Sequence, residues 1–305
     1  MRRRFLPPPT VTVPAAIAAV VLLVPADSLP AQVGSLLEEA DELYEDERYE
    51  DAIETVERAE VRASSNKERA EVYWHLARAH LGLGDEVREE DGDDRAAMRL
   101  YDRGKDYGDR AIEADSGNNL GYYWKASNLG RYGETRGILS SLSQARPMRE
   151  LLEQSISRDP EHASSYHVLG MLYARVPGGF VSFGNTDYAV SLARKAVELH
   201  LEEVERGDEE MYHPIRIELA SHLIDRGWSA GRRSREQRSK RREYRGAEDA
   251  VERGLYFEGD ADIPDMSDEE EAGRILNEVI DELESQAPPA GSRKARHLEQ
   301  AKELL

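Results

Sequence analysis

Apolar and small side chains recur along most of the chain at intervals of three and four residues, the period of an amphipathic helix. The clearest case lies between Asp159-Pro160 and Ala174. Four residues there share one helix face, at positions i, i+3, i+4 and i+7: Tyr166, Leu169, Gly170 and Tyr173. Pro160 ends the preceding helix, because proline has no N–H and disfavours helical geometry in the residue before it. The pattern therefore predicts a helical hairpin.

The same arrangement recurs from about residue 35 to residue 254. A small residue lies at the centre of the first helix of each predicted pair: Ala40, Ala77, Ala126, Gly170 and Ala220. Successive members of this set are 37, 49, 44 and 50 residues apart. Because a small residue lets a second helix approach closely, we expect about five helical pairs in a row.

The order aromatic-x2-Leu-Gly-x2-Tyr from Tyr166 to Tyr173, followed by a helix with alanines at 189, 193 and 196, resembles the tetratricopeptide repeat. This resemblance implies an all-α, right-handed superhelix of about five tetratricopeptide-like helical pairs. It also implies a C-terminal capping helix region, which repeat arrays need. The fold hosts many activities, so it does not define a function.

More specific resemblances lie in the runs YWKASNLGRYGE, RELLEQSISRDPEHASSYHVLG and PGGFVSFGNTDYAVSLARKAVEL. They are similar to exported bacterial repeat proteins and, more distantly, to the regulators of microtubule dynamics. The T-component of tripartite ATP-independent periplasmic transporters is also similar, but it is a lipoprotein, and this chain has no cysteine to accept a lipid.

The repeats are longer than the usual period of about 34 residues. From the second pair on, we expect the extra residues to form insertions between paired helices, at 85–94, 138–147 and 175–184. In the fifth pair, the first helix contains Ala220 and the second is expected to run to about Gly254. It begins with eight basic residues between 232 and 245, which we expect to form a solvated face or, alternatively, to hold an acidic partner or the acidic segment 85–94.

The N-terminus has the layout of a secretory signal. Arginines at 2–4 precede an apolar run from Val11 to Val24, and Ala26 or Ala31 could precede the cleavage site. The run is shorter than the ~20 residues needed to cross a bilayer as a helix, although an uncleaved anchor is the alternative. The expected organisation is a signal peptide at 1–32, a repeat array at 33–258, and an acidic linker with capping helices at 259–305. We expect a periplasmic protein that contacts a membrane only if the signal is uncleaved.

Composition and charge narrow the function classes. The chain has 61 acidic and 41 basic residues and a net charge of −20, so we expect no nucleic-acid partner. It has no cysteine, no GxSxG motif and no phosphate-binding loop. The pairs His75/His80 and His162/His167 have i, i+5 spacing, which diverges on a helix. We therefore expect no enzyme activity, no metal site and no cofactor.

The candidate binding residues follow the packed positions of the predicted first helices, where side chains point into a concave groove. They are Trp74, Arg78, Tyr123, Trp124, His167 and Met171. Aromatic and cationic side chains one turn apart suit a peptide; the alternative is that Trp74 and Trp124 pack between helices. In the glycine-rich insertion, Phe180 and Phe183 are expected to face a partner or gate a ligand, or else to dock near His167 and Met171.

The sequence thus favours an exported, non-catalytic interaction scaffold that binds another envelope protein or peptide through its concave groove and insertion rim. The alternative is a small-molecule-binding accessory component of a periplasmic transport system.

Overall fold

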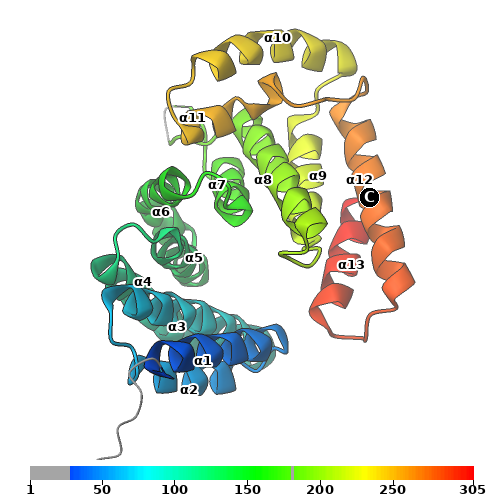
Figure 1. Cartoon of the computed structure of the whole chain (residues 1–305). Helices are drawn as coiled ribbons and strands as arrows, with labels where there is room; N and C mark the ends of the chain where they lie inside the picture. The colour runs from blue at the N-terminus through cyan, green and yellow to red at the C-terminus, as the bar shows by residue number, and fades with distance from the viewer. Residues whose placement is uncertain (1–27, 180–181) are drawn as a thin grey trace, which may run out of the picture.

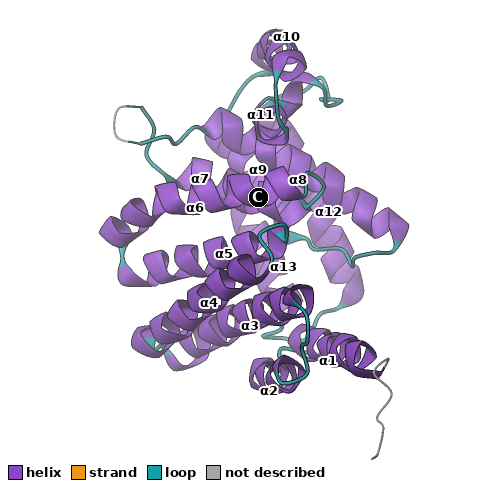
Figure 2. Ribbon diagram, turned by 60° about the vertical axis from the view of Figure 1, so that its left-hand side comes forward, coloured by secondary structure: helices purple, strands orange, loops and turns teal. Residues whose placement is uncertain are grey.

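The computed structural model describes residues 28–179 and 182–305, and the regular structure in these ranges is helical (Figures 1 and 2). The first helices are α1 (Ser28–Glu45), α2 (Tyr49–Glu60), α3 (Asn66–Glu86), η1 (Val87–Asp91), α4 (Asp94–Ala114), α5 (Asn119–Arg136), α6 (Ile138–Arg158) and α7 (Ala163–Arg175). The remainder are α8 (Thr186–Arg206), α9 (Pro214–Arg226), α10 (Ala230–Gly246), α11 (Ala250–Leu255), η2 (Phe257–Gly259), α12 (Asp268–Gln286) and α13 (Arg293–Leu304).

Helices adjacent in sequence pack as pairs: α1 with α2, α3 with α4, α5 with α6, and α7 with α8. Each pair buries the small residue predicted for its first helix, including Ala77 and Ala126 at 0% exposure. The closest approach predicted from the sequence is also present. A Cβ atom added to Gly170 would lie 3.2 Å from the carbonyl oxygen of Ala189 and 3.4 Å from the nitrogen of Ala193, both on α8. The predicted all-α array of tetratricopeptide-like pairs is confirmed.

The fifth pair differs from the prediction. Helix α9 packs against α12, not against the basic helix α10. Ala220 and Leu223 of α9 share a buried cluster with Leu276 and Val279 of α12. The prediction that the basic helix is the second helix of this pair is wrong because α10 has no apolar stripe with which to cover α9. The pair therefore spans the predicted boundary at residue 258, and α10, α11 and η2 form the longest insertion between paired helices.

Two of the three predicted insertions, 138–147 and 85–94, are helical instead of irregular. Helix α6 begins at Ile138 and continues through Pro147, so residues 138–147 lengthen a helix instead of forming a loop. Proline removes one backbone hydrogen bond, but packing of Ala145 and Met148 against the neighbouring core holds this turn in place. The acidic segment 85–94 is also mostly helical, because α3 ends at Glu86, η1 covers Val87–Asp91 and α4 begins at Asp94. Of the three predicted insertions, the one after Arg175 is the one that stays largely non-helical in its described part.

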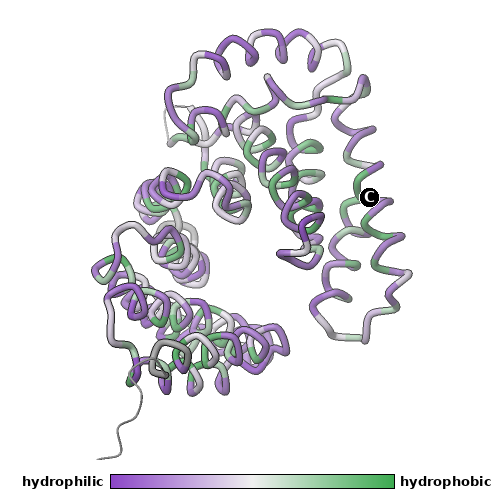
Figure 3. Tube along the Cα trace, in the orientation of Figure 1, coloured by the Kyte–Doolittle hydropathy of each residue, from purple (hydrophilic) through white to green (hydrophobic). Residues whose placement is uncertain are grey.

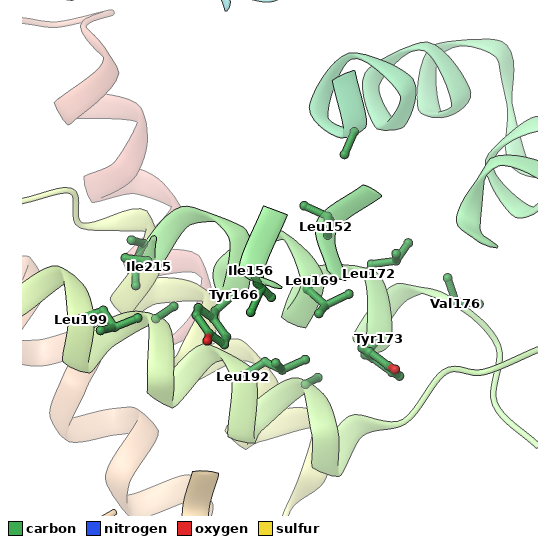
Figure 4. Close-up of a cluster of buried hydrophobic side chains, with 14 of the residues drawn as sticks. Leu152, Ile156, Tyr166, Leu169, Leu172, Tyr173, Val176, Leu192, Leu199 and Ile215 are labelled. Carbon is green, nitrogen blue, oxygen red and sulfur yellow. The ribbon is translucent and has the colours of Figure 1, made fainter. Parts of the chain in front are cut away.

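The largest hydrophobic cluster lies at the centre of the array and joins α5 to α9 (Figure 4). Tyr166 and Leu169, on the helix face predicted first, are 2% and 0% exposed within it. A second cluster joins α8, α9, α12 and α13, and a third joins α1, α2 and α3. Three separate clusters thus follow one another along the array.

An ionic network, here called the buried network, fastens α10 to this core. It contains four cations and four carboxylates: Arg194, Arg226, Arg233, Lys240, Asp187, Glu258, Asp268 and Glu271. Burial alone would raise the pKa of Glu258, but Lys240, Arg226 and Arg194 lower it well below its usual range. Two side chains of the basic helix, Arg233 and Lys240, are therefore interior residues instead of part of a solvated face.

The C-terminal helix returns to the start of the array. Arg293 Nε donates to Glu47 Oε1 at 2.9 Å and Arg293 Nη2 donates to the backbone oxygen of Glu45 at 2.9 Å. Arg296 lies 3.8 Å from Glu89. Figure 1 shows α13 beside the end of the α1–α3 layer. As predicted, a terminal helix covers α12 and α9, and it also links the last pair to the first.

Candidate functional site

Tyr212, in the connection between α8 and α9, lies on the inner surface of the curved array. This residue is 46% exposed, yet burial raises its pKa, so solvent reaches it while protein surrounds it. Arg131 of α5 and Arg293 of α13 lower this pKa, whereas Asp85 of α3 and Glu218 of α9 raise it. Charged groups from helices far apart in sequence thus act on this one tyrosine.

Arg78 lies at one end of this inner surface. It pairs with Asp41 of α1, and its guanidinium lies 4.4 Å from the ring centroid of Tyr44 and 5.3 Å from that of Trp74. Trp74 itself is only 9% exposed, and its Nε1 donates to Glu71 at 2.7 Å. The structure therefore brings Arg78 and Trp74 together. The Arg78 guanidinium packs on the Trp74 indole and lies closer to solvent than the indole does.

Tyr123 and Trp124 lie in the next pair. Their rings contact edge to face at 4.8 Å, and Tyr123 makes a similar 4.8 Å contact with His162. Burial raises the pKa of Tyr123 to about 12 although its side chain is only partly buried, as expected in a concave wall. Trp124 Nε1 has no hydrogen-bond partner among the described residues. Tyr123 and Trp124 are therefore adjacent, half-buried side chains of the inner surface.

His167 lies further along, on α7, with Met171 half-buried one turn later. Burial lowers the pKa of His167 to about 3, and the nearby His222 of α9, only 3% exposed, has its pKa lowered to about 4 for the same reason. Neither ring nitrogen of His222, nor Nδ1 of His167, has a hydrogen-bond partner in the described part of the chain. Both imidazole rings are therefore uncharged at pH 7.

These histidines predict acid lability between about pH 6.5 and pH 4. Their folded-state pKa values lie below the unfolded value of about 6.5, so the unfolded chain binds more protons in this window and stability falls as pH falls. Each contributes at most about 1.4 kcal/mol per pH unit. Urea titrations at pH 7.5, 6.5 and 5.5 should show this slope, and His222→Phe should reduce it. An unchanged slope in the variant would contradict the assignment.

A row of ion pairs, which sequence reasoning missed, crosses the inner surface from repeat to repeat. Arg131 lies 3.2 Å from Asp85 and 3.3 Å from Glu134, and Arg175 lies 2.8 Å from Glu134 and 3.7 Å from Glu218. These charged residues belong to α3, α5, α7 and α9. In α3, α5 and α7 they lie near the C-terminal end of the helix, whereas Glu218 lies one turn after the start of α9. Recurring charged residues in the first helices were the available signal.

The insertion after α7 is held at its base by a bridge between Gly178 and Gly184. Phe183 packs edge to face on Tyr173, with ring centroids 5.4 Å apart, and the Arg149 guanidinium lies 4.5 Å from its ring centroid. Its ring thus contacts Tyr173 of α7 and Arg149 of α6, and among the described residues His167 is not one of its ring contacts. Phe180 lies outside the described residues.

The change Phe183→Ser should therefore lower the free energy of unfolding by about 1–3 kcal/mol, because a half-buried ring and its contacts are lost. Chemical denaturation of the variant would measure this loss. Ser182→Ala, in the same insertion, serves as the control and should leave the midpoint unchanged. A Phe183→Ser midpoint equal to that of the unmodified protein would show that the ring is free for a partner.

No group of three or more potential metal ligands is found among the described residues. None of the described helices has the length and apolar content to cross a membrane.

Comparison with known proteins agrees with this architecture. Residues 36–176 match the family model "RMD1-3: Regulator of microtubule dynamics protein 1-3". This segment is a tetratricopeptide-like domain similar to those regulators. It contains Arg78, Tyr123 and His167, whereas Tyr212 and Arg293 of the inner surface lie beyond it.

Two curated relatives illustrate the extent of the regulator-like segment. Regulator of microtubule dynamics protein 1 of Bos taurus is 27% identical over 151 residues, covering 49% of this chain and 45% of the relative. The Mus musculus protein is 26% identical over 141 residues, or 46% of this chain and 44% of the relative. The chain therefore spans less than half the length of the curated relatives it matches. A thermophilic TPR protein of Thermus thermophilus has a crystal structure that aligns with 74% of this chain and 97% of its own, at 18% identity and a TM-score of 0.48.

Proposed function

We propose that this protein is a non-catalytic interaction scaffold that binds a peptide segment of another protein on the inner surface of the array. The observation that carries the proposal is the row of ion pairs that joins α3, α5, α7 and α9: Arg131 lies 3.2 Å from Asp85, and Arg175 lies 2.8 Å from Glu134 and 3.7 Å from Glu218. Tyrosine and arginine supply large contact areas and paired hydrogen bonds, and they dominate protein-binding hot spots.

The chemistry of this wall favours a peptide that carries both apolar and carboxylate groups. Tyr44, Tyr123 and Tyr212 provide faces for apolar side chains. Arg78 and Arg131 are each paired with a carboxylate, but the Arg131 side chain is 44% exposed, so part of its guanidinium stays open to solvent. A peptide carboxylate could compete for such donors, since guanidinium groups bind carboxylates with two parallel hydrogen bonds.

We place this partner outside the inner membrane, in a periplasm. The support is the signal-like N-terminus, whose first 27 residues lie outside the described part of the chain. Export predicts a mature species that begins near Asp27 or Gln32, which intact-mass measurement of the periplasmic fraction would detect. The full chain in the membrane fraction would instead favour an anchor.

The microtubule role in the relatives' names belongs to proteins of which this chain covers less than half. We carry over only the interaction role of a repeat domain.

A small-molecule ligand is the second candidate, favoured by buried nitrogens of Trp124, His167 and His222 that have no hydrogen-bond partner among the described residues. Native mass spectrometry of the purified protein separates the candidates, because a retained small molecule would add its mass to that of the protein.

Site-specific photo-crosslinking tests the main proposal. A photoreactive amino acid at position 212, on the inner surface, should give discrete adducts with a partner in envelope extract. The same residue at position 157, exposed on α6, should not, and Arg78→Ala with Arg131→Ala should weaken the adducts at 212. Equal labelling at 212 and 157 would reject the inner surface as the binding face.

A further inference from the structure

Helix α10 carries a straight row of arginines on its outer side, here called the arginine row. The row consists of Arg235, Arg238, Arg242 and Arg245. Their spacings of three, four and three residues place them on one helix face, and all four are exposed. The opposite face carries Arg233 and Lys240, which are buried. Figure 3 shows α10 as one of the most hydrophilic helices of the chain.

The arginine row has no acidic partner in the described part of the chain. Carboxylates that face α10 from other elements, such as Glu258 and Glu271, pair with Arg194, Arg226, Arg233 and Lys240 in the buried network. Glu236 and Glu243 of α10 itself form no ion pair with the row. None of the ion pairs formed among residues 28–179 and 182–305 includes a member of the row, although the chain has 61 acidic residues against 41 basic ones. The row is thus an unneutralised cationic surface on a strongly acidic protein.

An acidic groove of about 750 Å³ lies between α1 and α2. Six carboxylate side chains line it: Glu39, Glu42, Asp46, Asp51, Glu54 and Glu57. Its two basic lining residues are already engaged, Arg48 with Asp51 and Arg58 with Glu39. The other four carboxylates form no ion pair with another described residue and are here called the acidic set: Glu42, Asp46, Glu54 and Glu57.

The groove lies at the open end of the array. Its lining residues come from α1, α2 and the turns beside them, and α3, which packs on α2, contributes none. In a repeat array the face of each pair is normally covered by the next pair, so this face is one that a further helix would cover. Leu43 and the 88% exposed Val61 add apolar surface to it. The lengths also agree: α2 is about 18 Å long, and the arginine row spans about 15 Å.

We propose that α10 of one copy of this chain docks into the α1–α2 groove of a second copy, with the arginine row facing the acidic set. Figures 1 and 2 place α10 and α1–α2 at opposite ends of the molecule, so the contact joins two copies. The two surfaces have equal numbers of opposite, unpaired charges. The repulsion between two chains of net charge −20 is screened beyond about 8–10 Å at physiological salt, whereas direct contacts, which are shorter than this length, are screened less.

The contact is head-to-tail, because the two surfaces differ. Such an interface extends into an open chain or closes into a ring. The inner surface takes no part in it, so self-association adds to the proposed scaffold function without depending on it.

Two neutralised variants test the interface. The helix variant replaces all four arginines of the row by glutamine, and the groove variant is Glu42→Gln, Asp46→Asn, Glu54→Gln and Glu57→Gln. In sedimentation velocity at about 0.1 M NaCl, the unmodified protein should form species larger than a monomer, and about 0.5 M NaCl should dissociate them. Each variant alone should be monomeric. An equimolar mixture should form a 1:1 dimer and nothing larger, because it contains one intact helix and one intact groove.

A monomeric unmodified protein at both salt concentrations, or assembly of the helix variant to the same size as the unmodified protein, would overturn the proposal. So would a mixture without dimers, provided that both variants retain native circular dichroism and melting curves. Binding of the monomer to phosphatidylglycerol vesicles through the row would assign α10 to a membrane instead. Tyr212→Ala should leave the assembly unchanged, which separates a failure here from a failure of the proposed peptide-binding function.

Discussion

Replacing Asp268 by alanine is expected to lower the free energy of unfolding by about 3–5 kcal/mol, the usual cost of removing one partner from a buried ion pair. The Asp268 side chain is 0% exposed, and its carboxylate accepts from Arg226 at 2.8 and 2.9 Å and from the backbone nitrogen of Trp228 at 2.9 Å. It also lies 3.2 Å from Arg233 Nε. Without it, two guanidinium groups would stay buried with fewer counter-charges.

Guanidinium chloride would screen these charges, so the loss is best measured by urea denaturation. Asp208→Ala is a matched control, because Asp208 pairs with Arg206 at 2.7 Å while both side chains are more than half exposed. A surface pair of this kind contributes about 0–1 kcal/mol. Equal losses of unfolding free energy for the two substitutions would contradict the burial of the network.

The second large effect is expected from Gly170→Leu, which should destabilise the protein by about 1–3 kcal/mol or more through overpacking. The new side chain would extend from a position only 3.2 Å from the Ala189 carbonyl oxygen and 3.4 Å from the Leu192 Cβ. Two of the neighbouring atoms, the Ala189 oxygen and the Ala193 nitrogen, belong to the backbone of α8, which cannot move aside as a flexible side chain could. The two helices of the fourth pair would have to separate.

Thermal and urea denaturation would measure the loss. Gly273→Leu provides the control, since a Cβ atom at Gly273 meets nothing within 4 Å. That substitution should be neutral or slightly stabilising, because leucine favours a helix more than glycine does. Similar midpoints for both variants would mean that α7 and α8 are not held at the described distance.

The parts of the fold that were predicted from the sequence are those in which one helix face decides the packing. Tyr166, Leu169 and Gly170 show a helical period and a small contact residue, and these local features fix the α7–α8 pair. The α9–α12 pair escaped prediction because its helices are separated by α10, α11 and η2. Proximity in sequence favoured α10, and only the absence of an apolar stripe argued against it.

The inner surface was predicted less completely. Arg78, Tyr123 and His167 follow packed residues on first helices, so their side of the helix could be deduced. Tyr212 lies in a connection, and Arg293 comes from the far end of the chain, so no periodic pattern relates either to the groove. The burial of Arg233 and Lys240 depends on carboxylates from α8 and α12, and charge runs alone do not reveal such partners.

The contact between Arg293 and Glu47 changes how the array is expected to unfold. In an open array the terminal repeats have one neighbour each, so they open first and independently of the middle. Here the outermost elements hold each other across 246 positions of sequence. Opening either end must break the contact to the other, so the two ends should exchange their amide hydrogens together. Folding should accordingly finish only when residue 293 is available, since closing so long a loop comes after the local hairpins have formed.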